Sequence, residues 1–412
     1  MRHPTPSPGS LLEVGRVFLA LGLTSFGGPV AHLGYFRQAF VERRGWLSDA
    51  AYADLVALAQ FLPGPASSQV GMAIGLMRAG LPGLLMAWLA FTLPSALLML
   101  GFAYGTVWLA PEAGAGWVAG LKAAAVAVVA HAVLGLARSL TPDRQRATIA
   151  GLGLAGALLL PPLLGSAPLA QVTVILGGAL IGLIWLKPPD TTPPDGPDPH
   201  PPVGKALAAI CLALFALILL ALPLAARLAP GEAGTLLSVA DSFYRAGSLV
   251  FGGGHVVLPL LQAEVVDPGL VERGTFLAGY GAAQAVPGPL FTFAAFLGAV
   301  LTPDPGGPAL GPLGAAVALG AIFLPSGLLI IGGLPLWNRL RQAPQARQTL
   351  MGVNAAVVGL LAAALYDPVF TSGITSPQTL TLAAAALIAL NNWNLPAWTV
   401  VATCALIGTL SL

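Results

Sequence analysis

Long apolar stretches, separated by short polar ones, follow one another along nearly the whole chain. A helix needs about 20 apolar residues to cross the hydrocarbon core of a bilayer. In the first part of the chain these stretches are 11–35, 50–79, 82–109, 117–139, 147–164 and 167–187. In the last part they are 237–260, 275–301, 311–335, 349–366, 377–391 and 396–412, and segment 206–228 lies between the two sets. The pattern predicts an all-α membrane protein.

An internal repeat relates the two sets of segments. Four short motifs recur in the same order, 224 to 232 positions further along the chain. The pairs are Phe26-Gly27-Gly28-Pro29 with Phe251-Gly252-Gly253-Gly254, Gln60-Phe61-Leu62-Pro63-Gly64-Pro65 with Gln284-Ala285-Val286-Pro287-Gly288-Pro289, Leu93-Pro94-Ser95 with Leu324-Pro325-Ser326, and Gly120-Leu121-Lys122-Ala123-Ala124 with Gly352-Val353-Asn354-Ala355-Ala356. Residues 1–187 and 237–412 therefore form two homologous halves, and one loop insertion of about seven residues separates their registers.

The connection between the halves has two parts. Residues 188–205 are rich in Pro and Asp, with eight prolines and three aspartates in 188–202, and should form an extended cytoplasmic linker. Segment 206–228 should be a connecting transmembrane helix. Six segments per half plus one extra helix start the second half on the opposite face of the membrane. This arrangement predicts an inverted-topology repeat, a common plan of secondary transporters.

The first two segments of each half contain Gly-Gly or Pro-Gly-Pro near the middle, so they are either broken spanning helices or re-entrant hairpins. The distribution of charged loops favours hairpins. Hairpins put the loop with Arg43 and Arg44 inside and the acidic loop with Glu264 and Asp267 outside, as the positive-inside rule expects. Spanning helices would put each loop on the wrong side.

Composition supports a broken-helix architecture around a pathway. The chain is 56% hydrophobic and only 8% charged, whereas soluble domains carry about 25% charged residues. Its 51 glycines and 37 prolines are too many for plain spanning helices. Irregular backbone at membrane depth is tolerated only where protein buries it or where it lines a wet cavity.

Several classes of function have no support in the sequence. Cys211 and Cys404 are single residues in apolar runs, which argues against a disulfide framework or a metal site. There is no nucleotide-binding P-loop, no H-E-x-x-H zinc motif, no G-x-S-x-G nucleophile and no basic patch for nucleic acid. We therefore expect no enzyme, no metal and no cofactor.

The Pro-Gly-Pro elements are the strongest candidates for a binding site. Proline fits the first turn of a helix, so Gly64-Pro65 and Gly288-Pro289 predict helix starts after a break. Free N–H groups and the positive end of a helix dipole bind anions without a charged side chain. The Gly-Gly breaks can act in the same way, because bare backbone lets a ligand approach closely. The alternative is that these residues merely kink and pack membrane helices.

Polar side chains next to the breaks extend this site. Gln60 and Gln284 precede the two Pro-Gly-Pro elements and can donate to an oxyanion or satisfy freed carbonyls. Ser67, Ser68 and Thr292 can donate hydroxyls or cap the helices that follow. The candidate substrate-binding residues are Gly27, Gly28, Gln60, Pro63, Gly64, Pro65, Ser67, Ser68, Lys122, Gly252, Gly253, Gly254, Gln284, Pro287, Gly288, Pro289, Thr292 and Asn354.

A few ionisable residues lie within the apolar segments and are functional candidates by default. Lys122 can attract an anion, and its repeat mate is the polar Asn354. Asp54 can carry a coupling proton or lie at the interface. His32 and His255 flank the Gly-Gly breaks and can titrate near neutral pH, or each can simply bond a freed carbonyl.

These motifs resemble those of the chromate ion transporter family in its long form with two homologous domains. The resemblance rests on F-G-G-P, on F-G-G-G-H-V-V-L-P-L-L at 251–261, and on the two P-G-P elements preceded by glutamine. It implies efflux of chromate across the bacterial inner membrane and chromate resistance, with sulfate as a look-alike substrate. The alternatives are a transporter of sulfate or another oxyanion and, from a different class, a membrane-embedded enzyme or scaffold.

Overall fold

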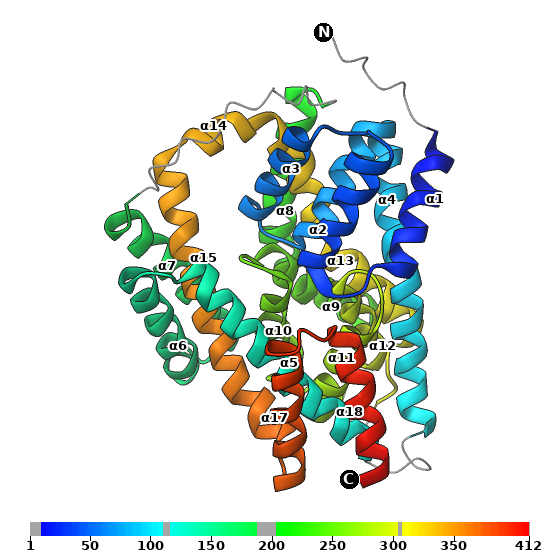
Figure 1. Ribbon diagram of the computed structural model, residues 1–412. Helices are drawn as coiled ribbons and strands as arrows, with labels where there is room; N and C mark the ends of the chain where they lie inside the picture. The colour runs from blue at the N-terminus through cyan, green and yellow to red at the C-terminus, as the bar shows by residue number, and fades with distance from the viewer. Residues whose placement is uncertain (1–9, 110–115, 188–202, 304–306, 412) are drawn as a thin grey trace.

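The computed structural model describes residues 10–109, 116–187, 203–303 and 307–411, and these residues fold into helices without strands (Figure 1). Residues 188–202 of the predicted linker (188–205) lie outside the described residues, and its last residue, Lys205, begins α8. The helices of the first half are α1 (Leu11–Thr24), α2 (Gly28–Arg37), η1 (Gln38–Arg43), α3 (Asp49–Phe61), α4 (Ala66–Leu109), α5 (Gly116–Leu140), α6 (Arg144–Leu164) and α7 (Ala167–Trp185). The connecting helix is α8 (Lys205–Leu228), and the all-α prediction is confirmed.

The second half repeats this order with short helices around its breaks. Its helices are α9 (Gly231–Ser248), η2 (Gly254–Val256), α10 (Val257–Leu261), η3 (Gln262–Val266), α11 (Arg273–Ala285), η4 (Leu290–Thr292), α12 (Phe293–Val300), α13 (Gly311–Gly333), η5 (Leu334–Leu336), α14 (Trp337–Gln342), α15 (Pro344–Ala364), η6 (Leu365–Phe370), α16 (Thr371–Gly373), α17 (Pro377–Asn391) and α18 (Ala397–Ser411). Seven helices in the described ranges are long and apolar enough to span a membrane.

The motif segments form hairpins whose arms are too short to cross a bilayer. α1 has 14 residues and α3 has 13. At a rise of 1.5 Å per residue these two arms are about 20 Å long and the 18-residue α9 of the second half is about 27 Å long, while the hydrocarbon core is about 30 Å thick. The arms therefore reach the middle and return, and Figure 1 shows the turn between α1 and α2 at mid-height of the molecule.

The two halves differ in length at the connection that follows the second hairpin, and the second half carries the insertion. In the first half, α4 turns back on itself at Ala79 and Gly80, which have non-helical backbone angles, so Gly75 and Gly83 come into backbone contact. In the second half, a loop of about ten residues joins α12 to α13 and brings Gly298 against Gly314 in the same way. The second half thus makes the same close contact between glycines as the first half, but with a longer connection between its helices.

The two halves are interleaved rather than side by side. α6 and α7 of the first half pack on α15 of the second half, while α17 and α18 pack on α5 of the first half. Glycines make these contacts close: Gly352 of α15 abuts Gly178 and Gly182 of α7, and Gly120 of α5 abuts Gly408 of α18. Small residues let membrane helices approach backbone to backbone. Because Gly120 and Gly352 are repeat mates, the swapped packing follows the repeat.

Two boundaries differ from those expected. α9 begins at Gly231, six residues before the predicted start of its half at 237. Glu264, expected in an exposed acidic loop, instead lies in η3 with a side-chain exposure of 7% and forms an ion pair with Arg245. The return arm of this hairpin is therefore longer than the hydropathy pattern indicates, and the exposed loop is confined to residues after Val266.

The hairpin topology has a direct test, with α3 and α14 at one end of the molecule and α17 and the C-terminus at the other (Figure 1). In a chain in which Cys211 and Cys404 are replaced by alanine, single cysteines are placed at two exposed positions, Arg43→Cys and Pro268→Cys. An impermeant maleimide added to intact cells should label the cysteine at 268 and should label the cysteine at 43 only after permeabilisation. The reverse labelling would contradict the hairpins and leave the repeat intact.

Candidate functional site

The tips of the four hairpins meet in pairs across the two halves. The N–H of Gly64 donates to the carbonyl of Val250 at 2.7 Å, and the N–H of Gly288 donates to the carbonyl of Ser25 at 2.8 Å. Gly64 and Gly288 are repeat mates, as are Ser25 and Val250. The Pro-Gly-Pro tip of each half is thus bonded to the Gly-Gly tip of the other half, and all four breaks lie together.

Glycine conformation makes these tips possible. Gly27, Gly64 and Gly288 have φ values of 99°, 125° and 96°, a region that side chains disfavour. Gly28, Gly252 and Gly253 also have positive φ, whereas Gly254 opens η2. A Cβ on Gly28 would meet nothing within 4 Å, so this stretch of backbone is open to a ligand.

A serine of the opposite half, Ser326 of α13 or Ser95 of α4, lies against each Pro-Gly-Pro tip. A Cβ built on Gly64 would clash with the hydroxyl of Ser326, and a Cβ on Gly288 would lie 2.7 Å from the Oγ of Ser95. Both serines are fully buried. They belong to the repeated Leu-Pro-Ser motif, so this contact also obeys the repeat.

The helices after the breaks begin one residue later than expected. α4 begins at Ala66, and Pro65 precedes it with a carbonyl that accepts from the N–H of Gln69 at 2.9 Å. η4 begins at Leu290, with Pro289 as its N-cap. The first N–H groups of each helix have no acceptor within the helix, so they remain available to a ligand, as an anion site at a helix start requires.

Buried polar atoms without a hydrogen-bond partner gather around the tips. Near the tips these atoms are Ser25 Oγ, Ser68 Oγ, Gln69 Oε1, Thr92 Oγ1, Gln284 Nε2, Ser326 Oγ and Asn354 Oδ1, and other such atoms, for example in Trp117 and Trp337, lie elsewhere in the described residues. Buried polar groups normally have partners, and each exception needs an explanation. The hydroxyls and the Gln284 amide N–H among them are donors, and a bound oxyanion would supply their missing acceptors; the carbonyl oxygens of Gln69 and Asn354 are acceptors and would need a different partner.

The predicted side chains reach this region unequally. Ser67, Ser68 and Thr292 are buried; the Ser67 hydroxyl lies 3.4 Å from His32 Nδ1, and the Thr292 hydroxyl donates to the carbonyl of Pro289 at 2.8 Å. Gln284 is buried, whereas its repeat mate Gln60 is exposed. Pro63 accepts from the Gln69 side chain at 2.7 Å, and Pro287 is buried at the equivalent tip.

The repeat mates Lys122 and Asn354 separate in space. Asn354 lies beside the Gly252 break, where its Oδ1 would be 3.5 Å from a Cβ on that glycine. The Lys122 side chain instead extends to Gly274, in the first turn of α11 and far along that helix from its tip. There it lines a cavity of about 710 Å³ together with Tyr104 and Glu272. The structure therefore does not bring Lys122 to the tips.

The three candidates for coupling lie in different surroundings. His32 is fully buried, and its Nε2 lies 3.1 Å from the carbonyl of Ser25, which also accepts from the N–H of Gly288. His255 instead contacts the Tyr280 hydroxyl at 2.9 Å. Asp54 is paired with Arg341 of α14 at 3.2 Å, an ion pair between the two halves at the α3 end of the molecule.

Two matches to a known sequence profile decide the family. The profile described as Chromate transporter matches residues 12–183 and again residues 237–409. The chain belongs to the chromate transporter family. Because the profile matches each half separately, the two homologous halves are confirmed as well.

Individual family members cover most of the chain. A chromate transport protein of Pseudomonas aeruginosa is 30% identical over 370 residues, which are 88% of this chain and 82% of that protein. A chromate transport protein of Cupriavidus metallidurans is 27% identical over 415 residues, 98% of this chain and 94% of that protein. An uncharacterized transporter of Methanocaldococcus jannaschii is 28% identical over 360 residues, 86% of this chain and 83% of that protein. No solved structure matches.

Sequence reasoning missed several polar residues of the tip region in this family member. The sequence did contain a signal for Ser95 and Ser326, because both belong to the Leu-Pro-Ser motif that recurs in the two halves. Ser25 and Gln69 carried none, since their repeat mates are Val250 and Phe293, and only the fold places them at the breaks.

The tip site predicts a specific effect of a carboxylate. In Ser68→Asp and Thr292→Asp the new charge meets the positive end of a helix dipole, which is favourable by about 0.3–1 kcal/mol at exposed sites. It would also lie where a dianion binds, and like charges about 4 Å apart repel by about 4 kcal/mol at an effective dielectric of 20. We expect chromate binding to the purified protein to weaken by about a thousandfold, while Ser68→Asn and Thr292→Asn keep most of it.

The control places a carboxylate in the first turn of a remote helix. Gln145→Asp at the start of α6 should leave binding at the parent level. The titration belongs at alkaline pH, because burial favours the neutral acid. Parent-level binding by both aspartate variants would show that the tips do not hold the anion.

Proposed function

We propose that this chain is a secondary transporter that exports chromate from the cytoplasm across the bacterial inner membrane and thereby confers chromate resistance. The observation that carries the proposal is the pairing of the four breaks, Gly64 with Val250 and Gly288 with Ser25. Broken helices that meet at an inverted-repeat interface are where secondary transporters bind substrates.

The chemistry of the site suits a tetrahedral oxyanion. Chromate offers only acceptor oxygens at neutral pH, and the tips offer donors: first-turn N–H groups after Pro65 and Pro289, and the hydroxyls of Ser68 and Ser326. Neutral donors aimed at one place recognise charge and shape without a salt bridge. Family membership and the names of the relatives support chromate as the substrate.

A cation lines a cavity at some distance from the tips. Lys122 lines the cavity between α5 and α11, and no ion pair in the described residues engages it. We infer that it attracts the anion into this cavity rather than binding it at the breaks. At the opposite end, the Asp54–Arg341 ion pair joins α3 to α14.

Transport in membrane vesicles tests both substrate and direction. Inside-out vesicles containing the protein should accumulate labelled chromate beyond vesicles from cells that lack it. Excess sulfate should compete, because sulfate is also a tetrahedral dianion at neutral pH. Accumulation by right-side-out vesicles alone would reverse the direction and remove the resistance role. Chromate transport that ignores sulfate but is blocked by phosphate would contradict the described site.

A further inference from the structure

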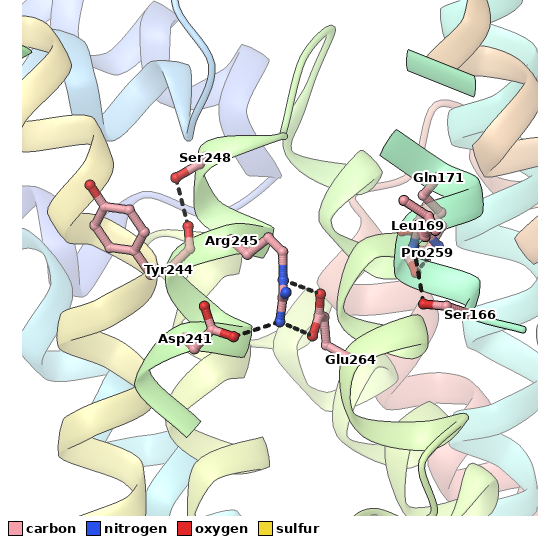
Figure 2. A network of polar contacts seen from close by, with 9 residues as sticks. All are labelled: Ser166, Leu169, Gln171, Asp241, Tyr244, Arg245, Ser248, Pro259 and Glu264. Atoms are coloured by element: carbon pink, nitrogen blue, oxygen red, sulfur yellow. Dashed lines mark hydrogen bonds and ion pairs between the residues drawn. The ribbon is translucent and has the colours of Figure 1, made fainter. Parts of the chain in front are cut away.

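An ionic network joins the two arms of the first hairpin in the second half (Figure 2). The guanidinium of Arg245 on α9 contacts Glu264 on η3 through two nitrogens, at 2.8 Å and 3.0 Å, and also contacts Asp241 at 2.8 Å. The Glu264 side chain is 7% exposed and that of Asp241 is 12% exposed. Three charged side chains thus contact one another between apolar helices.

The fold itself does not need this network. By the repeat offset, the equivalents of Arg245 and Glu264 in the first half are Ala20 and Ala39. Those alanines line an open cavity of about 310 Å³ between the arms α1 and α2. The first hairpin nevertheless reaches the same tip, where the Ser25 carbonyl accepts from Gly288. The network therefore serves a purpose other than closing the hairpin.

The network carries an excess negative charge. Two carboxylates share one guanidinium, and burying an unbalanced charge is costly unless it is neutralised. Arg227, exposed at the end of α8, is the further charge that acts on Asp241. The helices α7, α10 and α13 that pack nearby contain no charged residue. The remaining charges on adjacent elements are Lys205 at the start of α8, Glu232 at the start of α9, Asp267 after η3 and Arg273 at the start of α11.

A hydroxyl-lined pocket lies next to the residues that carry the carboxylates. Thr235, Ser238 and Ser242 lie three or four positions apart on α9, hence on one side of the helix. They line a pocket of about 270 Å³ that also touches Leu301, in the loop after α12. Ser242 directly follows Asp241 in α9, and Val265, which also lines this pocket, directly follows Glu264. Water in this pocket would therefore connect the outer loops with the network.

We propose that the Asp241–Arg245–Glu264 network is a proton-binding site that couples transport to a proton gradient. One proton arriving through the hydroxyl-lined pocket adds to a carboxylate oxygen and forms a carboxylic acid, so the charge of the network rises from −1 to zero. No other bond is made or broken except hydrogen bonds to Arg245. This proposal rests on the proposed transport function.

The position of the network links it to the tip. Arg245 lies less than two turns of α9 before Val250, whose carbonyl accepts from Gly64. Neutralising a carboxylate weakens its hold on Arg245 and so loosens α9 from η3. The same hairpin carries the Gly252-Gly253 break, so proton binding and anion binding act on one element.

The test removes one ionisable group without changing its shape. Glu264→Gln is compared with the parent and with Glu13→Gln, which alters another acid–base pair, Glu13–Arg78, on the arms of the first half. Chromate accumulation in proteoliposomes is measured with and without an imposed pH gradient, and movement of protons is followed with a trapped pH dye. Gradient-free chromate exchange measures the competent fraction of each preparation and normalises the result.

The parent and Glu13→Gln should accumulate more chromate with the gradient and move protons with it, whereas Glu264→Gln should lose both responses. If Glu264→Gln responds to the gradient as the parent does, the network has only a structural role and the proposal is wrong. If that variant shows no exchange, Asp241→Asn takes its place under the same criterion. A parent that exchanges chromate but ignores the gradient refutes only the coupling; a parent that does not exchange chromate refutes the proposed function.

Discussion

Backbone hydrogen bonding inside the membrane is the constraint on which the rest of this structure depends. A helix that breaks at bilayer depth exposes N–H and C=O groups that lipid cannot satisfy. This chain breaks four helices there and brings the breaks together, so that Gly64 bonds Val250 and Gly288 bonds Ser25 across the halves. The remaining N–H groups at the helix starts form a polar centre without a full charge, which is suited to an anion.

The hydrogen bonds between the tips are weaker than the helix packing that surrounds them, and this difference allows the tips to move while the scaffold stays in place. Each backbone hydrogen bond contributes about 0.5–1.5 kcal/mol net, so an oxyanion that accepts from the same glycines can replace them at small cost. The scaffold is held differently, by the interleaved contacts of α5 with α18 and of α15 with α7, where Gly120 and Gly352 allow backbone approach. We infer that the tips can rearrange while the swapped helices hold the halves together.

Much of the fold was predictable because the repeat converts weak motifs into strong ones. One Pro-Gly-Pro is ambiguous, but two at equivalent positions, each with Gly-Gly and Leu-Pro-Ser partners, predicted the breaks and the two halves. Interleaving of the halves was not predictable, since apolar periodicity does not say which helix a glycine faces.

The site was predictable where it follows the repeat and obscure where it departs from it. Ser25 and Gln69 have apolar repeat mates, so only their burial beside the breaks reveals them. Lys122 shares its register with Asn354, yet its long side chain extends away to Gly274. Glu264 looked like a loop residue because its partner, Arg245, lies 19 positions earlier on the opposite arm.

The central claim is that the anion lies where the four breaks meet. The most direct measurement is a structure of the chain with bound chromate, located by the anomalous scattering of chromium. The account predicts a chromium atom between the tips, with its oxygens within about 3 Å of first-turn N–H groups after Pro65 and Pro289. Chromium found only in the cavity beside Lys122, with the Gly64–Val250 and Gly288–Ser25 bonds intact, would contradict it.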